Sequence, residues 1–422
     1  MSKRLLEPIL TGGIRNNYFF NGRLLSAEDL REEQEANTEG RKRLGQAIGD
    51  GVVYGLHVSE TVGTSSKSAP VITVEPGLCL NRRGVALALA EATDVSLVRP
   101  VPPGTTLSSG ATFQDCQPLE TSVYVAGEGV YLLTIGPSSG KEGRAPVSGL
   151  GNTGGTCNSH YTIEGVQFRL IPLDLTAAEL SDHARLRNLV AYKCYGVADV
   201  EGFFSNPFGP VVEGYGLLDG LRATLLTDCE VPLAVLHWTA QGGINFIDEW
   251  AVRRSVTEQA VTEKWPILFG ERRVRETEAM CLQFQEQVEE IAIKETGLDS
   301  IVATDRFKYL PPVGLLPIKG TGSPKGFNPQ KFFGNRASRE LANIDANLVR
   351  ALVHEALHHE PIELSAPEKV QLYVIWENLQ AVEGLQTTQL ALVFASHTLP
   401  YRGVARYGYG LWDISRFAPS VI

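Results

Sequence analysis

The stretch Asn17-Tyr18-Phe19-Phe20-Asn21-Gly22-Arg23-Leu24-Leu25-Ser26-Ala27-Glu28-Asp29-Leu30 leads into a long charged segment and then into Gly51-Val52-Val53-Tyr54-Gly55-Leu56. Ser26 followed three residues later by Asp29 is typical of a capping box, in which side chains satisfy free backbone N–H groups at a helix start. The sequence therefore predicts a helix that begins after Ser26 and ends at about Ile48.

This predicted helix is very polar. Acidic residues come early between Glu28 and Arg43, and Arg41, Lys42 and Arg43 come late, an order that complements the helix dipole. Such a helix has little apolar stripe with which to join a core of its own. We therefore expect it either to lie on the surface or to have its environment completed by a second protein.

Three aromatic residues and a glycine turn precede the helix, and nothing in this stretch resembles a catalytic pattern. We expect the aromatic side chains to anchor against another subunit or another domain, because three such rings are costly to leave in water. The candidate interface residues are Tyr18, Phe19, Phe20, Arg23, Leu24 and Leu25.

This N-terminal signature resembles a family of proteins encoded with phage-tail-like contractile injection systems, particles that drive a spike and tube through a target envelope. The resemblance continues through residues 71–89, through residues 157–172 with Glu164-Gly165-Val166-Gln167-Phe168-Arg169-Leu170, and through residues 231–254 and 305–378. It implies a structural or baseplate-associated part of the particle, with no catalytic residues to carry over. The general layout, an extended segment and helix before a β-rich body, is also similar to that of baseplate connector proteins of type VI secretion.

Length and composition narrow the class of protein. A chain of 422 residues with 43% hydrophobic residues predicts two or three domains, each with a proper core. The net charge of −10 argues against a nucleic-acid-binding surface or a polybasic membrane anchor. No segment approaches the roughly 20 apolar residues of a membrane span, and the first residues lack the apolar run of a signal peptide. We expect a cytoplasmic protein within an assembled particle, extracellular only after release.

The six cysteines are scattered, with no pair at CxxC spacing. In a cytosolic chain this pattern predicts six free thiols, buried or incidental, and no metal site built from them. The cysteines are Cys79, Cys116, Cys157, Cys194, Cys229 and Cys281.

Composition shifts divide the chain into three predicted domains. Residues 1–100 form an extended segment, helix and small β module; residues 101–262 form a β-rich middle domain; and residues 263–422 form a C-terminal α+β domain. Alternation and turn residues predict hairpins and helices within them. The expected hairpins join 52–58 with 71–74, 78–80 with 85–89, 231–238 with 244–247, and 370–376 with 389–396; expected helices cover 175–192, 274–296 and 345–359.

His354-Glu355-Ala356-Leu357-His358 matches the HExxH pattern, in which two histidines on one helix face bind zinc and the glutamate activates water. Glu363, Glu377 or Glu383 is available as a third ligand. Against this reading, Pro361 ends the helix at once and no downstream motif fixes a third ligand. A structural helix is the favoured interpretation, with bound metal at His354 and His358 as the alternative.

Three other features have two interpretations each. The Gly- and Ser-rich residues 136–155 predict a long surface loop, since they lack the strand–loop–helix frame and the Lys of a phosphate-binding loop. The aromatic residues 203–208 and the tail 401–417 fit either a contact surface for carbohydrate or protein, or the closed edge of a core.

Together these observations predict an α+β fold with a largely antiparallel β body, an N-terminal helix and two helices in the C-terminal region. The predicted function is a non-enzymatic structural subunit of a contractile injection particle, at or near the baseplate, that joins subunits or holds an accessory part. Its partners would be other baseplate, spike or sheath subunits and copies of itself, in threes or sixes, with no cofactor. The alternatives are a module that binds an envelope surface and a zinc hydrolase.

Overall fold

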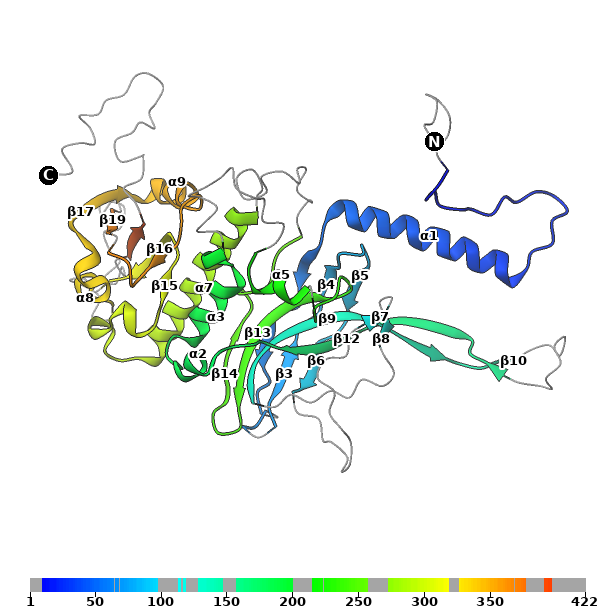
Figure 1. Ribbon diagram of the computed structural model, residues 1–422, viewed down its shortest axis with the longest axis horizontal. Helices are drawn as coiled ribbons and strands as arrows, with labels where there is room; N and C mark the ends of the chain where they lie inside the picture. Colours follow the sequence, from blue (N-terminus) through cyan, green and yellow to red (C-terminus); the bar gives the residue numbers. More distant parts are fainter. Residues whose placement is uncertain are drawn as a thin grey trace, which may run out of the picture.

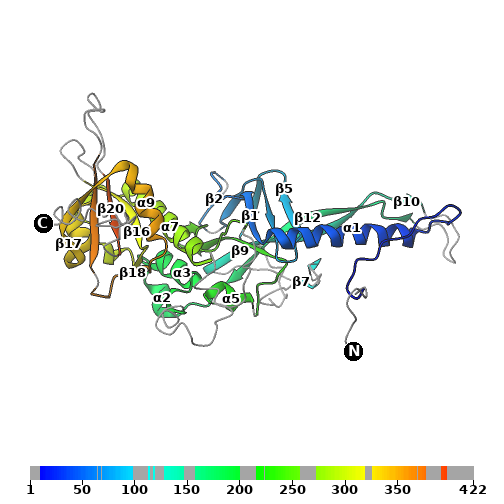
Figure 2. The same ribbon diagram turned by 90° about the horizontal axis from the view of Figure 1, so that it is seen from above.

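The computed structural model describes residues 10–63, 65–67, 69–97, 113–114, 117–118, 128–146, 157–199, 215–222, 224–256, 272–318, 326–367, 369–376 and 391–396. A body of sheets and helices makes up most of the molecule. Helix α1 (Ala27–Ile48) and a ribbon formed by β9 (Gly129–Glu142) and β12 (Tyr161–Pro172) project from one end of it (Figures 1 and 2). The C-terminal region lies at the opposite end. The mixture of helices with mainly antiparallel sheets confirms the α+β prediction.

Helices occur in every part of the described chain. They are α1 (Ala27–Ile48), α2 (Ala177–Ser181), α3 (Leu186–Cys194), α5 (Leu217–Arg222), α7 (Arg272–Lys294), α8 (Pro329–Phe333) and α9 (Ala346–Ala356), with 3-10 turns η1 (Leu298–Ser300), η2 (Ala303–Asp305) and η3 (Gly334–Arg336).

The strands are short near the N-terminus and longest in the middle of the chain. They are β1 (Gly51–Gly55), β2 (Val58–Glu60), β3 (Val71–Val74), β4 (Gly77–Leu80), β5 (Ala86–Leu89), β6 (Thr93–Ser96), β7 (Phe113–Gln114), β8 (Gln117–Pro118), β9 (Gly129–Glu142), β10 (Ala145–Pro146), β11 (Cys157–Asn158), β12 (Tyr161–Pro172), β13 (Val231–Thr239), β14 (Gly243–Asp248), β15 (Tyr309–Leu310), β16 (Val313–Pro317), β17 (Ala337–Asp345), β18 (Ile362–Glu363), β19 (Val370–Trp376) and β20 (Ala391–Ala395).

The first β module consists of two three-stranded sheets, ordered β1-β4-β5 and β2-β3-β6. The predicted hairpin of 78–80 with 85–89 is confirmed as the antiparallel pair β4–β5. The strand expected over 52–58 is instead split into β1 and β2, and only β2 pairs with β3. β1 pairs with β4 and not with β3, because the chain breaks direction at Leu56, which has a positive φ of 58°.

The central sheet has the order β12-β9-β13-β14, and it is buried on both faces where β9 pairs with β13. Along β9, Tyr131, Leu133 and Ile135 pack against the first β module. Val130 and Leu132 alternate with them and pack against α3, α5 and α7 on the other face. Since both faces are covered, β9 and β13 read as continuous apolar runs. The β13–β14 hairpin predicted from residues 231–247 is confirmed.

Helix α7 joins the central sheet to the C-terminal region. Ala279 and Met280 pack beneath the central sheet, whereas Phe284 and Val288 belong to a phenylalanine-rich core further along. The predicted apolar stripe of this helix is therefore confirmed, and its two ends enter different cores.

The C-terminal sheet has the order β16-β20-β19-β17. The predicted pairing of residues 370–376 with the strand near 391–395 is confirmed as β19–β20. One face of the sheet meets the phenylalanine-rich core, and the other is covered by α9 through Leu352 and Ala356. Strand β17, which pairs in parallel with β19, was not predicted from the sequence.

Two predicted elements differ from the structure. The helix expected over 175–192 is interrupted between α2, which ends at Ser181, and α3, which begins at Leu186. Asp182 has φ −88° and ψ 61°, which lies outside the helical region, so the helix ends there. The loop expected over 136–155 is wrong for its first seven residues. They continue β9 as far as Glu142, because β12 pairs with every one of them.

The three-domain division stays a prediction. One core cluster contains Val52, Ile72 and Leu87 from residues 1–100 together with Leu133 and Leu236 from residues 101–262. The first β module and the central sheet therefore share a hydrophobic core across the expected boundary.

Candidate functional site

Half of the exposed large apolar side chains among the described residues lie on the N-terminal arm, which we define as residues 10–48. The arm consists of an extended segment, residues 10–25, and helix α1. Ser26 caps α1: its side chain accepts from the Asp29 N–H, and the Asp29 side chain accepts from the Ser26 N–H, so the predicted capping box is present. The helix has 22 residues and extends for about 33 Å at 1.5 Å per residue.

The extended segment folds back along α1 through polar contacts. The Asn17 N–H donates to the Glu33 carboxylate at 3.4 Å, and the Asn17 amide donates to the Asp29 carbonyl. Further along, the Arg43 guanidinium donates to the Gly12 carbonyl at 2.8 Å. These bonds fix the course of the segment but bury little apolar area.

A turn at the far end of the arm presents the aromatic side chains. Gly22 has a φ of 94°, which favours glycine, and the Arg23 N–H donates to the Phe20 carbonyl at 3.2 Å. The Arg23 guanidinium donates to the Tyr18 carbonyl at 2.7 Å and pairs with the Asp29 carboxylate. Hydrogen bonds from Ser26, followed by the Arg23 charge, lower the pKa of Asp29. Arg23 therefore holds the turn against the helix start.

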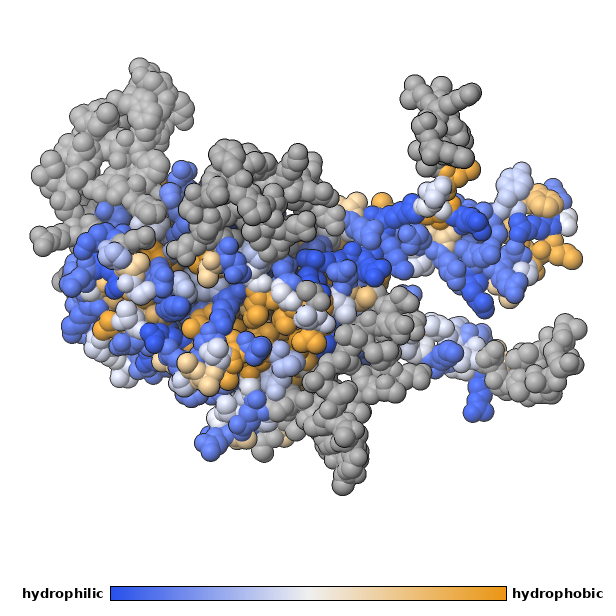
Figure 3. Space-filling model, in the orientation of Figure 1, coloured by the Kyte–Doolittle hydropathy of each residue, from blue (hydrophilic) through white to orange (hydrophobic). Residues whose placement is uncertain are grey.

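The other predicted interface residues are exposed at this end of the arm (Figure 3). We call residues 18–25 the arm tip. Leu24 is 93% exposed and Tyr18 is 78% exposed, and Phe19, Phe20 and Leu25 are each exposed by half or more. Of the eighteen exposed large apolar side chains among the described residues, nine lie on the arm. Four of these nine lie outside the tip and were not among the predicted interface residues: Leu10, Leu30, Leu44 and Ile48.

The root of the arm is packed tightly on the body. Gly45 of α1 lies against Gly84 in the β4–β5 turn, so close that a Cβ on Gly45 would meet the Gly84 carbonyl oxygen at 2.1 Å. After the helix, the Val52 N–H donates to the Arg254 carbonyl at 2.8 Å. The arm is therefore fixed at one end and exposed at the other.

A second element projects from the same end of the molecule (Figures 1 and 2). Beyond Ile135, β9 pairs with β12 alone, because β13 reaches no further than that residue. The resulting two-stranded ribbon exposes Tyr161 and Ile163. This ribbon could not be predicted from the sequence, since its β9 half is rich in glycine and serine.

The HExxH segment lies on the surface. Helix α9 ends at Ala356, three residues before the predicted end, so His358 follows the helix. The His354 and His358 rings are 6.0 Å apart between centroids, and both side chains are exposed with Glu355 between them. Glu363 instead accepts from the Ser365 hydroxyl at 2.6 Å, and Glu377 and Glu383 lie outside the described residues.

No group of three or more His, Cys, Asp or Glu side chains in the described ranges is placed to hold a metal ion. The aromatic clusters at 203–208 and 401–417 also fall outside the part of the chain that the structure describes.

The prediction of six free thiols is wrong. Cys79, Cys194 and Cys281 are free, but Cys229 is disulfide-bonded. Burial raises the pKa of each of the three free thiols to about 12, so they are poor nucleophiles at neutral pH. Sequence spacing could not reveal the disulfide, because a bridge depends on which backbones the sheets bring together.

Among the described helices, none combines the length and apolar character that crossing a membrane requires.

Comparisons with known proteins gave matches only among solved structures. No protein-family profile and no curated protein matches this chain. A crystal structure of TssK matches with a TM-score of 0.27 and 9% identity, over 67% of this chain and 52% of that one. The TssK-TssF-TssG baseplate subcomplex of the type VI secretion system, determined by cryo-electron microscopy, contains a chain that matches with a TM-score of 0.24 and 11% identity, over 67% of this chain and 73% of that one. This chain thus spans about half the length of the first match, and at these TM-scores neither match carries an argument about function.

Proposed function

We propose that this protein is a non-enzymatic structural subunit of a phage-tail-like contractile injection particle, sited at or near the baseplate. The observation that carries the proposal is the N-terminal arm, whose root is fixed to the body and whose apolar tip is exposed. The resemblance of residues 17–30 and of the later segments to proteins encoded with such particles supports the choice of assembly.

The arm tip is better suited to contact with a protein partner than to exposure to water. Full burial of a large apolar side chain contributes roughly 1.5 to 3 kcal/mol, so covering Tyr18, Phe19 and Phe20 would stabilise a contact by several kcal/mol. The polar shaft of α1 contains only Ala36 and Gly45 as buried residues, and it therefore supplies no core to cover the tip. A clustered apolar surface of this kind marks an interaction site.

The arm would allow the subunit to contact a partner at a distance from its own body. A helix of about 33 Å carries the tip well away from the body. In a particle with cyclic symmetry, each copy would place its tip on the same surface of a neighbour, whether that neighbour is a copy of this chain or another baseplate, spike or sheath subunit. The protein would assemble in the cytoplasm and leave the cell only with released particles.

The experiment is to delete residues 1–25 and measure co-sedimentation with purified particles, together with circular dichroism. The truncated chain should stay folded, because the body has its own cores, and should no longer sediment with particles. Retained co-sedimentation would show that the tip is not the anchor. Unfolding would show that the aromatic side chains belong to the protein's own core.

A pair of point variants sharpens this experiment. Leu24→Ser and Val62→Ser each remove a side chain that is more than nine-tenths exposed, the first on the arm tip and the second on the body. Loss of co-sedimentation in the Leu24 variant alone would support the tip as the contact. Equal behaviour of the two variants would contradict it.

The zinc hydrolase alternative has a separate test. The exposed positions of His354, Glu355 and His358 favour a surface helix end over an enclosed catalytic site. We expect purified protein to lack stoichiometric zinc by elemental analysis and Glu355→Gln to leave assembly unchanged. One zinc per chain, with an activity lost in that variant, would contradict the structural role.

A further inference from the structure

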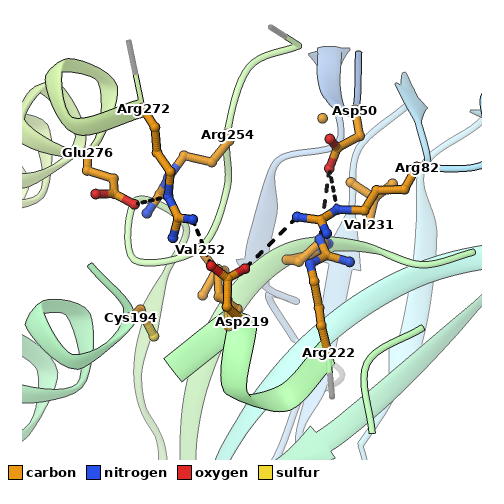
Figure 4. A pocket seen from close by; sticks show the side chains of 13 residues that line it. Asp50, Arg82, Cys194, Asp219, Arg222, Val231, Val252, Arg254, Arg272 and Glu276 are labelled. Atoms are coloured by element: carbon orange, nitrogen blue, oxygen red, sulfur yellow. Dashed lines mark hydrogen bonds and ion pairs between the residues drawn. The ribbon is translucent and has the colours of Figure 1, made fainter. Parts of the chain in front are cut away.

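A small cavity of about 110 Å³ lies at the root of the arm, where segments far apart in the sequence meet. Asp50 follows α1, Arg82 lies in the β4–β5 turn, Arg222 ends α5, and Arg254 and Arg272 come from either side of residues 257–271 (Figure 4). The lining contains four arginines but three carboxylates, which are Asp50, Asp219 and Glu276.

Two of the four arginines have their hydrogen-bonding groups occupied. Arg272 donates to Asp219 at 2.7 Å, to Glu276 at 2.9 Å and to the Tyr215 carbonyl at 2.9 Å. Arg254 donates to backbone carbonyls, including that of Trp250 at 2.8 Å. These interactions also use two of the three carboxylates.

The other two arginines make only long contacts with carboxylates. Arg82 lies 3.4 Å from Asp50 and 4.0 Å from Asp219. The contact between Arg222 and Asp50 is 3.9 Å long, beyond hydrogen-bonding distance. The Arg222 side chain is 13% exposed, and its Nη1 is buried without a hydrogen-bond partner in the described part of the chain. Burial, followed by the neighbouring Arg82 charge, lowers the pKa of Arg222.

An under-partnered buried guanidinium in a cavity calls for a ligand, because buried polar groups are normally satisfied by protein, water or an ion. The guanidinium fork matches the oxygens of phosphate and carboxylate groups, and bonds between ionised partners are the stronger ones. Size limits the choice, since the cavity of about 110 Å³ is well below the roughly 300 Å³ at which ligand pockets begin. A nucleotide would not fit, whereas a single tetrahedral oxyanion would.

We propose that Arg82 and Arg222 bind one compact oxyanion of the inorganic phosphate class in this cavity. The anion would bridge the β4–β5 turn, which carries Gly84 beneath α1, to helix α5 of the body. It would therefore stabilise the contact between the arm and the body. This site is independent of the arm tip, so either proposal can fail without the other.

The test measures the melting temperature of the full chain in increasing inorganic phosphate, against sodium chloride at matched ionic strength to account for screening. Because a ligand that binds the folded state raises its stability by mass action, phosphate should give a saturable rise. Arg222→Gln should weaken the apparent affinity at least tenfold. Arg41→Gln, which removes an exposed arginine of α1 outside the cavity, should leave the affinity unchanged.

Several outcomes would overturn the proposal. These are no rise beyond that in sodium chloride, equal affinity in the native protein and the Arg222 variant, or a saturable rise in acetate with none in phosphate, which would make the cavity a carboxylate site for a partner's side chain. If Arg222→Gln does not fold by circular dichroism, Arg222→Lys keeps the charge but loses the fork, and it should still weaken phosphate affinity. Unchanged affinity in a folded lysine variant would also contradict the site.

Discussion

The arm and the body differ in the interactions that hold them together and in where their apolar side chains lie. In the body, Phe284 is fully buried and packs with Phe307 and Phe394 at 5.3 Å between ring centroids, as part of a phenylalanine-rich core. In the arm, polar contacts such as that between Arg23 and Asp29 hold the chain, and the apolar side chains face outward. The difference indicates that folding depends on the body, and it motivates our proposal that the arm's surface contacts another molecule.

The largest expected effect is in the body core. Phe284→Ala should lower the free energy of unfolding by about 3–5 kcal/mol, the usual range for a buried aromatic, because it leaves a cavity between packed rings. Phe20→Ala on the arm tip should change it by about 0.5 kcal/mol or less, as exposed substitutions do. Chemical denaturation measures both. Similar losses in the two variants would erase the distinction between arm and body.

The disulfide at Cys229 gives the next effect, and it also falls in the body. Reduction should lower the free energy of unfolding by about 2–5 kcal/mol, the usual range for removing a native bridge. Thiol titration of the denatured, non-reduced chain should count at most four free thiols, since two of the six cysteines form the bridge. A count of six would contradict the structure and restore the sequence-based prediction.

The third prediction concerns the arm root. Gly45→Ala would drive a methyl group into the Gly84 carbonyl, so the root must shift, at a cost of about 1–3 kcal/mol for an overpacked contact. Hydrogen exchange should show faster exchange in α1 than in the native protein, with the central sheet unchanged. Gly40→Ala, where an added Cβ would only touch Ile14 at 4.0 Å, is the matched control on the same helix. Faster exchange in both variants would show that the contact between Gly45 and Gly84 is not what holds α1 on the body.

The smallest effect is a pH dependence in the body. A hydrogen bond from Lys193, at 2.5 Å, and then bonds from Thr176 lower the pKa of Glu179 to about 2. Its folded pKa lies below the unfolded value of about 4.3, so its contribution is present above pH 4.3 and is lost as the pH falls towards 2. Since the carboxylate lies near solvent, that contribution is about 1 kcal/mol or less. The stability difference between native protein and Glu179→Gln should therefore shrink below pH 4.3, and a constant difference would rule out this ion pair.

The sequence predicted local elements well and their partners poorly. The Ser26 capping box, the β4–β5 hairpin and the apolar stripe of α7 depend on neighbouring residues, and all are confirmed. The ribbon was missed, because residues 136–142 become a strand only through pairing with β12.

The candidate site shows the same limit. The tip residues were predicted from a run of aromatic and leucine residues beside a polar helix. The cavity at the arm root was not, because Arg82 and Arg222 lie 140 positions apart in the sequence and only the fold brings them to one carboxylate. Arg23 was expected to face a partner, and its role in holding the turn depends on contacts that spacing does not show.

The central claim is that another subunit covers the arm tip in the assembled particle. Hydroxyl-radical footprinting of the free chain and of purified particles tests it without any mutation. In the free chain, Tyr18 and the exposed Tyr54 of β1 should both be oxidised, and the buried Tyr192 should not. In particles, Tyr18, Phe19 and Phe20 should become protected. Equal oxidation of these three residues in the free chain and in particles would contradict the account.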